Sequence, residues 1–209
     1  MSRSSLWGID SNFFGEKLTE FENSWLFTPV ADDILFKKYL PSKVFSKFGN
    51  EQSYLTAIMF DRTIFRDLNK KINNCNVVED QILWELTNQQ IFQTKDKEFV
   101  ADSIEKFLSI NKKFTDDLGE HIFERFTEVA NEIRKLENKN KYFVFKNTSC
   151  DDSVERWFEK YNEEKEETKS ISLLDLDEIV VELKIIKNGK IVDNILNTKL
   201  KEFLEKGSF

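Results

Sequence analysis

A long apolar stripe constrains the fold of this 209-residue chain more than any other feature. From Ile122 to Leu136, apolar side chains recur at intervals of three and four, which places them on one face of an α-helix. The positions between them carry charge, at Glu124, Arg125, Glu128, Glu132 and Arg134. A helix over about 119–137 with one apolar face must bury that face against other elements of the fold, so the stripe predicts a globular core.

Four segments predict β-structure, and one of them is the short β-prone run QIFQT at 90–94. Asn188-Gly189 lies between the apolar runs EIVVELKII and KIVDNI, and this pair favours the type I′ turn of a hairpin. The run YFVFK at 142–146 is aromatic and β-branched, which predicts a strand buried on both faces. Short apolar clusters over residues 6–28, on either side of Glu22-Asn23, suggest an early strand or hairpin.

Further helices follow from capping signals. Thr28-Pro29 favours a helix that ends at Pro41. From Tyr54 the sequence predicts either one long helix or a strand followed by a helix that begins near Asp61, so the conformation of residues 52–60 stays open. Asn76 with Glu79 resembles a capping box, and Thr94 is suited to cap the next helix. Asn197 or Thr198 is expected to begin a terminal helix.

Helices outnumber strands, and strands fall near the beginning, in the middle and near the end of the chain. We therefore expect an α+β fold: one mostly helical domain over residues 1–209, with a small antiparallel or mixed sheet that includes the C-terminal hairpin. The stretch 162–172 is rich in Glu and Lys and contains no Pro or Gly, which predicts a mobile acidic loop within this domain.

Aromatic residues precede this acidic stretch. Val154, Trp157, Phe158 and Tyr161 have helical spacing after a potential cap at Asp152, so a helix docked on the core is the first interpretation. The alternative is recognition of a basic partner by rings and acids together. The candidate partner-binding residues are Trp157, Tyr161, Glu163, Glu164, Glu166 and Glu167.

The charge balance favours a protein partner over a nucleic acid. With 38 acidic and 31 basic residues the net charge is -7, which repels phosphates. Lys, Asn, Ile, Phe and Glu outnumber Ala, Gly and Pro, as AT-rich codons would produce in a low-GC bacterium or its phage. We expect a non-enzymatic acidic protein-binding module, an immunity-like or anti-defence inhibitor of a basic toxin or nuclease.

The sequence contains few residues or motifs that suit catalysis or cofactor binding. His121 is the single histidine, and surface or cap packing is its simplest role. The acidic pairs, such as Asp32-Asp33 and Asp116-Asp117, suit helix starts better than a metal site. Glycine-rich phosphate loops are absent, and Cys75 and Cys150 form no metal-binding pair. We expect no cofactor and no metal.

One pattern suggests a different class of function. Glu182-Leu183-Lys184 on a predicted strand, with Asp175 or Asp177 upstream, resembles the acid and E-x-K core of the PD-(D/E)xK nucleases. That resemblance implies a metal-dependent nuclease with Asp177, Glu182 and Lys184 as catalytic residues. The competing interpretation places Glu182 and Lys184 on the solvent-exposed face of a hairpin.

The remaining expectations concern location and assembly. The amino-terminal segment lacks an apolar signal core and no window is long enough to span a membrane, so we expect a cytoplasmic protein without membrane partners. A third functional possibility is a subunit of a larger assembly, which would expose an aromatic patch around Trp7, Phe13, Phe14 and Trp25. The oligomeric state is not determined by the sequence.

Overall fold

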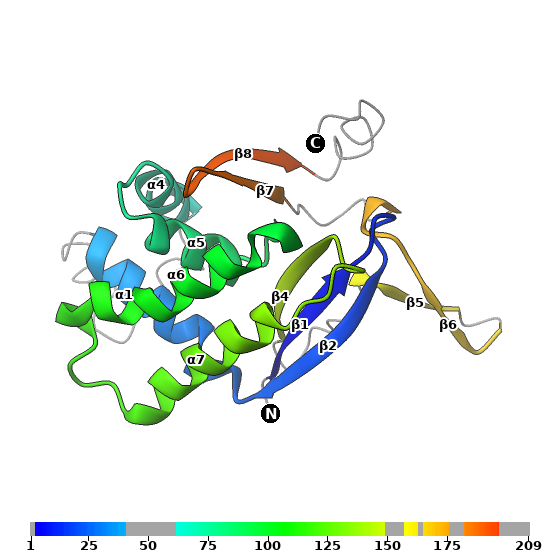
Figure 1. The fold of residues 1–209 in the computed structure, drawn as a ribbon, viewed down its shortest axis with the longest axis horizontal. Coiled ribbons are helices and arrows are strands. Elements are labelled where there is room, and N and C mark those ends of the chain that lie inside the picture. Colours follow the sequence, from blue (N-terminus) through cyan, green and yellow to red (C-terminus); the bar gives the residue numbers. More distant parts are fainter. Residues whose placement is uncertain (1–2, 41–61, 149–156, 163–164, 176–181, 197–209) are drawn as a thin grey trace.

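The fold is α+β, as the sequence predicts, with helices packed on one side of a central sheet (Figure 1). The computed structural model describes residues 3–40, 62–148, 157–162, 165–175 and 182–196. The predicted helix start at Asp152, the terminal helix and residues 52–60 lie outside these ranges. A separate two-stranded hairpin extends from the side of the sheet opposite the helices (Figure 1).

The six-stranded sheet is mixed. Its spatial order is β2-β1-β4-β3-β7-β8, and every neighbouring pair is antiparallel except β3 with β7, which is parallel. The strands are β1 (Arg3–Ile9), β2 (Gly15–Glu22), β3 (Ile91–Gln93), β4 (Tyr142–Thr148), β7 (Glu182–Lys187) and β8 (Lys190–Leu196).

The helices build the larger core on one face of the sheet. They are α1 (Thr28–Tyr39), α4 (Arg62–Asn73), α5 (Val78–Thr87), α6 (Lys97–Ile110) and α7 (Glu120–Arg134). Short 3₁₀ turns occupy Ser24–Leu26, Thr94–Asp96, Lys112–Phe114 and Leu173–Asp175. The rings of Phe27, Phe126 and Phe145 meet in this core, with centroids 4.6 and 4.9 Å apart, and so join the helix layer to β4.

A second, smaller core covers the other face of the central strands. Trp7, Ile91 and Val144 point to this face and are buried by Trp157, Phe158 and Leu173 from the chain after β4. Because both faces are covered, Tyr142 to Phe145 are all buried, which confirms the prediction for this strand.

Several local predictions are confirmed and others are wrong in detail. The long helix α7, the helix from Thr28 and the hairpin around Asn188-Gly189 are all present; both turn residues have positive φ, at 52° and 69°. The early hairpin also forms, but β1 ends at Ile9 and β2 begins at Gly15, so its turn precedes Glu22-Asn23. The N-cap of α5 is Val77 rather than Asn76, without a side-chain cap bond.

Candidate functional site

The segment expected to form an aromatic helix instead forms a projecting hairpin. Strand β5 (Glu159–Asn162) pairs antiparallel with β6 (Glu167–Ser170), so the helix expected through Tyr161 is wrong at its end and part of the expected loop at 162–172 is a strand. Apart from the half-buried Asn162, the strand residues are exposed. We call Glu159–Ser170 the arm.

The base of the arm is anchored in the smaller core. Phe158 is fully buried and stacks on Trp7 with ring centroids 4.6 Å apart. The Ile171 amide donates to the Phe158 carbonyl at 2.7 Å, and Phe14 forms a bridge with Ser172. A Cβ at Gly15 would lie 2.3 Å from the Phe158 ring, so this close approach requires a glycine. The arm therefore has a fixed origin and an exposed body.

The predicted partner-binding residues separate into different environments. Trp157 is buried, and Lys146 Nζ lies 2.9 Å from the centre of its ring, so Trp157 packs in the core as the first interpretation predicts. Tyr161 is 58% exposed on β5. Glu166 occupies the turn with a positive φ of 51°, and Glu167 begins β6. Glu163 and Glu164 lie outside the described residues.

The E-x-K residues of the nuclease hypothesis form part of a buried ion-pair cluster. Lys184 is only 2% exposed, so its assignment to a wet face is wrong. Its ammonium pairs with Glu182 at 2.5 Å and with Glu85 of α5 at 3.0 Å. Burial raises the pKa of the Glu85 carboxyl, and the neighbouring Lys184 opposes that shift. Glu85 is the member that sequence reasoning missed.

This cluster supplies two carboxylates, and the Lys184 ammonium pairs with both of them. Within the described ranges no group of three or more His, Cys, Asp or Glu side chains is placed to hold a metal ion. Asp177, the upstream acid of the hypothesis, lies outside those ranges. Asp175 is exposed at the end of a 3₁₀ turn. The nuclease hypothesis therefore stays a prediction.

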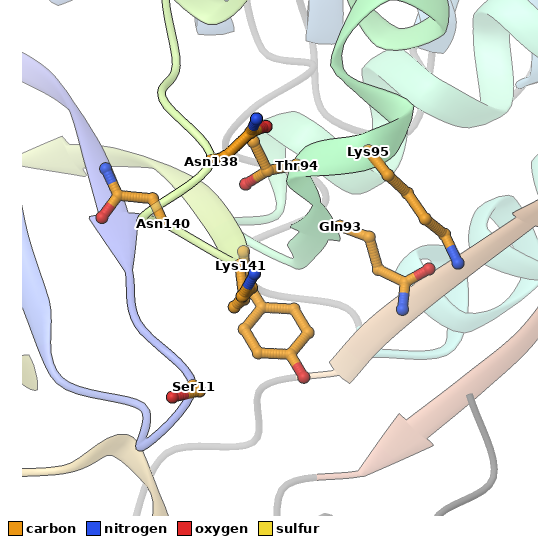
Figure 2. A pocket seen from close by; sticks show the side chains of 8 residues that line it. Ser11, Gln93, Thr94, Lys95, Asn138, Asn140 and Lys141 are labelled. Atoms are coloured by element: carbon orange, nitrogen blue, oxygen red, sulfur yellow. The ribbon is translucent and has the colours of Figure 1, made fainter.

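A pocket of about 610 Å³ opens where β3 ends and β4 begins (Figure 2). Its lining comes from the β1–β2 turn, the β3–α6 junction and the loop after α7: Ser11, Gln93, Thr94, Lys95, Asn138, Asn140, Lys141 and Tyr142. The strand ends meet here because Gln93 pairs with Tyr142 across β3 and β4. The Thr94 amide also donates to the Lys141 carbonyl at 2.9 Å, which holds the two segments together.

Two residues that line this pocket carry polar atoms that are closed to solvent. Gln93 and Thr94 are each 5% exposed, yet Gln93 Oε1 and Thr94 Oγ1 have no hydrogen-bond partner among the described residues. Thr94 begins a 3₁₀ turn, and the N-cap of α6 is Asp96, so Thr94 is not the cap of α6 that its sequence context predicts. No sequence signal marked this pocket as a site, because its lining residues come from separate segments.

The other predicted features have structural explanations. His121 is exposed at the start of α7. Its ring packs so closely on Gly119 that a Cβ added to Gly119 would lie 2.6 Å from His121 Cε1. Cys75 is a free thiol that donates to the Val77 carbonyl, whereas Cys150 lies outside the described residues. The expected aromatic patch is wrong for Trp7 and Phe13, which are buried; Phe14 and Trp25 are exposed.

Comparison with known proteins supplies no relative. No family model matches the chain, and neither a curated protein nor a solved structure matches it. In the part of the chain that the structure describes, no helix has the length and apolar character needed to cross a membrane. Function has to be inferred from the residues themselves.

Proposed function

We propose that this chain is a cytoplasmic, non-enzymatic protein-binding module that contacts a basic partner through the arm, as an immunity-like or anti-defence inhibitor does. The observation that carries the proposal is the exposure of β5 and β6 on both faces. An isolated two-stranded hairpin is marginally stable in water, and this one contributes little to the core beyond its base. A partner surface would give these strands the contacts that the fold does not provide.

The side chains of the arm indicate the chemistry of that partner. Between Glu159 and Ser170 the sequence has five Glu and three Lys, and four of the Glu fall within positions 163–167. Tyr161 adds an exposed ring, a side chain that interfaces favour because it brings large contact area at low entropic cost. A surface rich in Arg and Lys complements this combination, and the net charge of -7 would accelerate the encounter.

Site-specific crosslinking tests the proposal. A photo-crosslinking residue at position 161 is used to capture partners from the native host, and a second probe at Phe123, which is exposed on α7, serves as the matched position. We expect position 161 to capture a basic protein whose binding is lost when Glu163, Glu164, Glu166 and Glu167 are changed to Lys. The purified partner should lose its toxic or nuclease activity in the complex.

A matched charge reversal separates the arm from general acidity. Glu120 and Glu124 lie exposed on α7, and Asp116 and Asp117 lie exposed just before it, so changing these four acids to Lys reverses the same number of charges without altering the arm. This variant should keep most of the affinity. Loss of binding in the α7 variant but not in the arm variant would refute the assignment of the arm, and capture of only acidic or neutral proteins would refute the basic partner.

A further inference from the structure

The outer edge of β6 is open in the arm, which extends away from the rest of the fold (Figure 1). Its sheet consists of β5 and β6, so within the described residues no strand lies on the other side of β6. The Ile171 amide donates to the Phe158 carbonyl, which makes these two residues a hydrogen-bonded pair. Because such pairs alternate along an antiparallel ladder, the amides and carbonyls of Thr168 and Ser170 point away from β5. These groups can bond to the backbone of another strand.

The charges on β6 are complementary to those of a second copy of β6. Glu167 and Lys169 flank Thr168 and point to the same face, because side chains alternate along a strand. When two copies pair antiparallel with Thr168 opposite Thr168, each Glu167 lies opposite Lys169 of the other copy. A register centred on Glu167 or Lys169 would instead place like charges opposite each other, which is destabilising. Charges on an edge strand usually prevent pairing, whereas this sequence favours one register of pairing with itself.

We propose that two copies of this chain associate through β6, with a two-fold axis at Thr168, into a four-stranded sheet of order β5-β6-β6-β5. This pairing would offset a repulsion inside the arm, where Lys160 lies directly opposite Lys169. Within one chain Lys169 pairs with the exposed Glu167 at 3.6 Å. In the four-stranded sheet, Glu167 of the second copy would add a carboxylate on the side of Lys169 away from Lys160. The pairing would also extend a hairpin that is marginally stable by itself.

This inference goes beyond the proposed function and is compatible with it. Pairing occupies the edge of β6, while the edge of β5 and the face that carries Tyr161 stay accessible. The four-stranded sheet would therefore present two copies of Tyr161 to a basic partner. The dimer is measured with the purified chain alone, so its absence would leave the capture experiment at position 161 unaffected, and failure of that capture would leave the dimer unaffected.

Sedimentation equilibrium of the purified full chain tests the association. One short strand pair is a small interface, so we expect a weak dimer that becomes populated between about 10 µM and about 1 mM protein. A chain that stays monomeric over this range would overturn the inference.

Charge reversal tests the register. Glu167→Lys and Lys169→Glu should each weaken the dimer at least fivefold, because each places like charges opposite one another twice. An equimolar mixture of the two variants should associate at least as tightly as the parent protein, since one edge then carries two Lys and the other two Glu. Glu159→Lys, an exposed position on β5, makes the same change of charge away from the paired edge and should leave the dimer unchanged. A mixture that associates no better than its separate components would refute the register.

Cysteine crosslinking tests the edge without changing a charge. In a Cys75→Ser and Cys150→Ser background, Thr168→Cys would place two thiols opposite each other with Cα atoms about 5.5 Å apart, a separation that a disulfide spans. Tyr161→Cys, across from Thr168 on β5, is the control, because its two copies would lie three strand spacings, or about 14 Å, apart. Mild oxidation should form the covalent dimer at least fivefold faster with Thr168→Cys. Crosslinking no faster than in the control would overturn the assignment of the β6 edge.

Discussion

Asp32 and Asp33 are adjacent in α1 but experience different environments. Asp32 faces α5, where its carboxylate accepts a hydrogen bond from the Thr87 hydroxyl at 3.0 Å. Burial raises the pKa of Asp32 to about 7, and the Thr87 hydrogen bond only partly opposes this shift. Asp33 points outward and pairs with Lys37 at 2.7 Å. The two side chains therefore form a natural pair for measuring what burial of one carboxyl does to stability.

The Asp32 carboxyl should make the protein less stable as pH rises. Its pKa is higher in the folded protein than in the unfolded chain, where Asp titrates near about 3.9, so its stabilising contribution is complete below about pH 4 and is lost as pH rises through about 7. Asp32→Asn should remove this dependence. Between pH 4 and pH 8, we expect the free energy of unfolding of the variant to rise by about 1–2 kcal/mol relative to that of the parent protein. This figure is reduced for partial solvent exposure.

Urea unfolding at several pH values between 4 and 8 measures this difference. Asp33→Asn, at the neighbouring ion-paired position, is the control and should follow the pH profile of the parent protein. The same slope in Asp32→Asn as in the parent would show that this carboxyl does not titrate in the folded state near pH 7.

At the scale of elements, local signals predict those that are specified locally. Helix α7 has a regular apolar stripe, and Asn188-Gly189 has the residues that a tight hairpin turn requires, so both were predictable. The arm was not, because glutamate-rich sequence has low β-propensity and its pairing depends on the anchor that Phe158 makes with Trp7. The aromatic spacing before it fits a helix equally well, and only the presence of the sheet face selects the other conformation.

The turn between β7 and β8 depends on backbone conformation rather than on space. Gly189 has a φ of 69°, but a Cβ there would meet the Phe99 ring at an ordinary 3.5 Å. Gly189→Ala should therefore lower the free energy of unfolding by about 1–2 kcal/mol, the cost of a left-handed conformation for a residue with a Cβ. Gly189→Asn should cost less, since Asn tolerates this region better.

Thermal and urea unfolding of the two Gly189 variants check this order. Equal destabilisation by Ala and Asn would mean that packing against Phe99, and not the backbone angle, limits the position.

At the scale of the whole molecule, buried charge joins the C-terminal hairpin to the helix layer and joins helices to one another. Lys184 on β7 lies between Glu182 of the same strand and Glu85 of α5, so an ion pair attaches the C-terminal hairpin to the helices, while strand pairing with β3 attaches it to the sheet. On the other side of α5, the buried Asp80 accepts hydrogen bonds from Tyr39 and Asn111. Contacts of this kind depend on residues far apart in sequence, which is why single-sequence patterns placed Lys184 on a solvated face.

Removing one charge of this cluster should lower the free energy of unfolding more than removing two charges. Lys184→Met leaves the Glu85 charge buried without its main partner, so we expect a loss of about 3–5 kcal/mol in the free energy of unfolding. Adding Glu85→Gln should recover part of that loss, because the uncompensated charge is removed. Lys135→Met, at an exposed site, is the control and should change stability by less than about 0.5 kcal/mol.

A double-mutant cycle measured by urea unfolding gives the coupling between Glu85 and Lys184. Additive effects would show that the two charges do not depend on each other. The double variant also serves the nuclease hypothesis: if it folds and the parent nicks plasmid DNA with Mg²⁺ or Mn²⁺, its loss of nicking cannot be attributed to unfolding.

The pocket illustrates the limit of sequence reasoning for sites. Gln93, Thr94 and Lys141 are unremarkable in sequence, and only the pairing of β3 with β4 brings them together. Because the site depends on strand register and not on a contiguous motif, composition and periodicity could not indicate it. The fold class, by contrast, follows from segments whose signals are local.

The parallel pairing of β3 with β7 has a consequence for biosynthesis. On the ribosome, Glu85 and β3 emerge well before Lys184 and the strand that carries it. Until β7 is made, β3 has an open strand edge and the Glu85 carboxyl lacks the Lys184 ammonium that pairs with it. Completion of the sheet must wait for the last hairpin to leave the exit tunnel. Until then, a chaperone that shields β3 would protect the unfinished protein from aggregation.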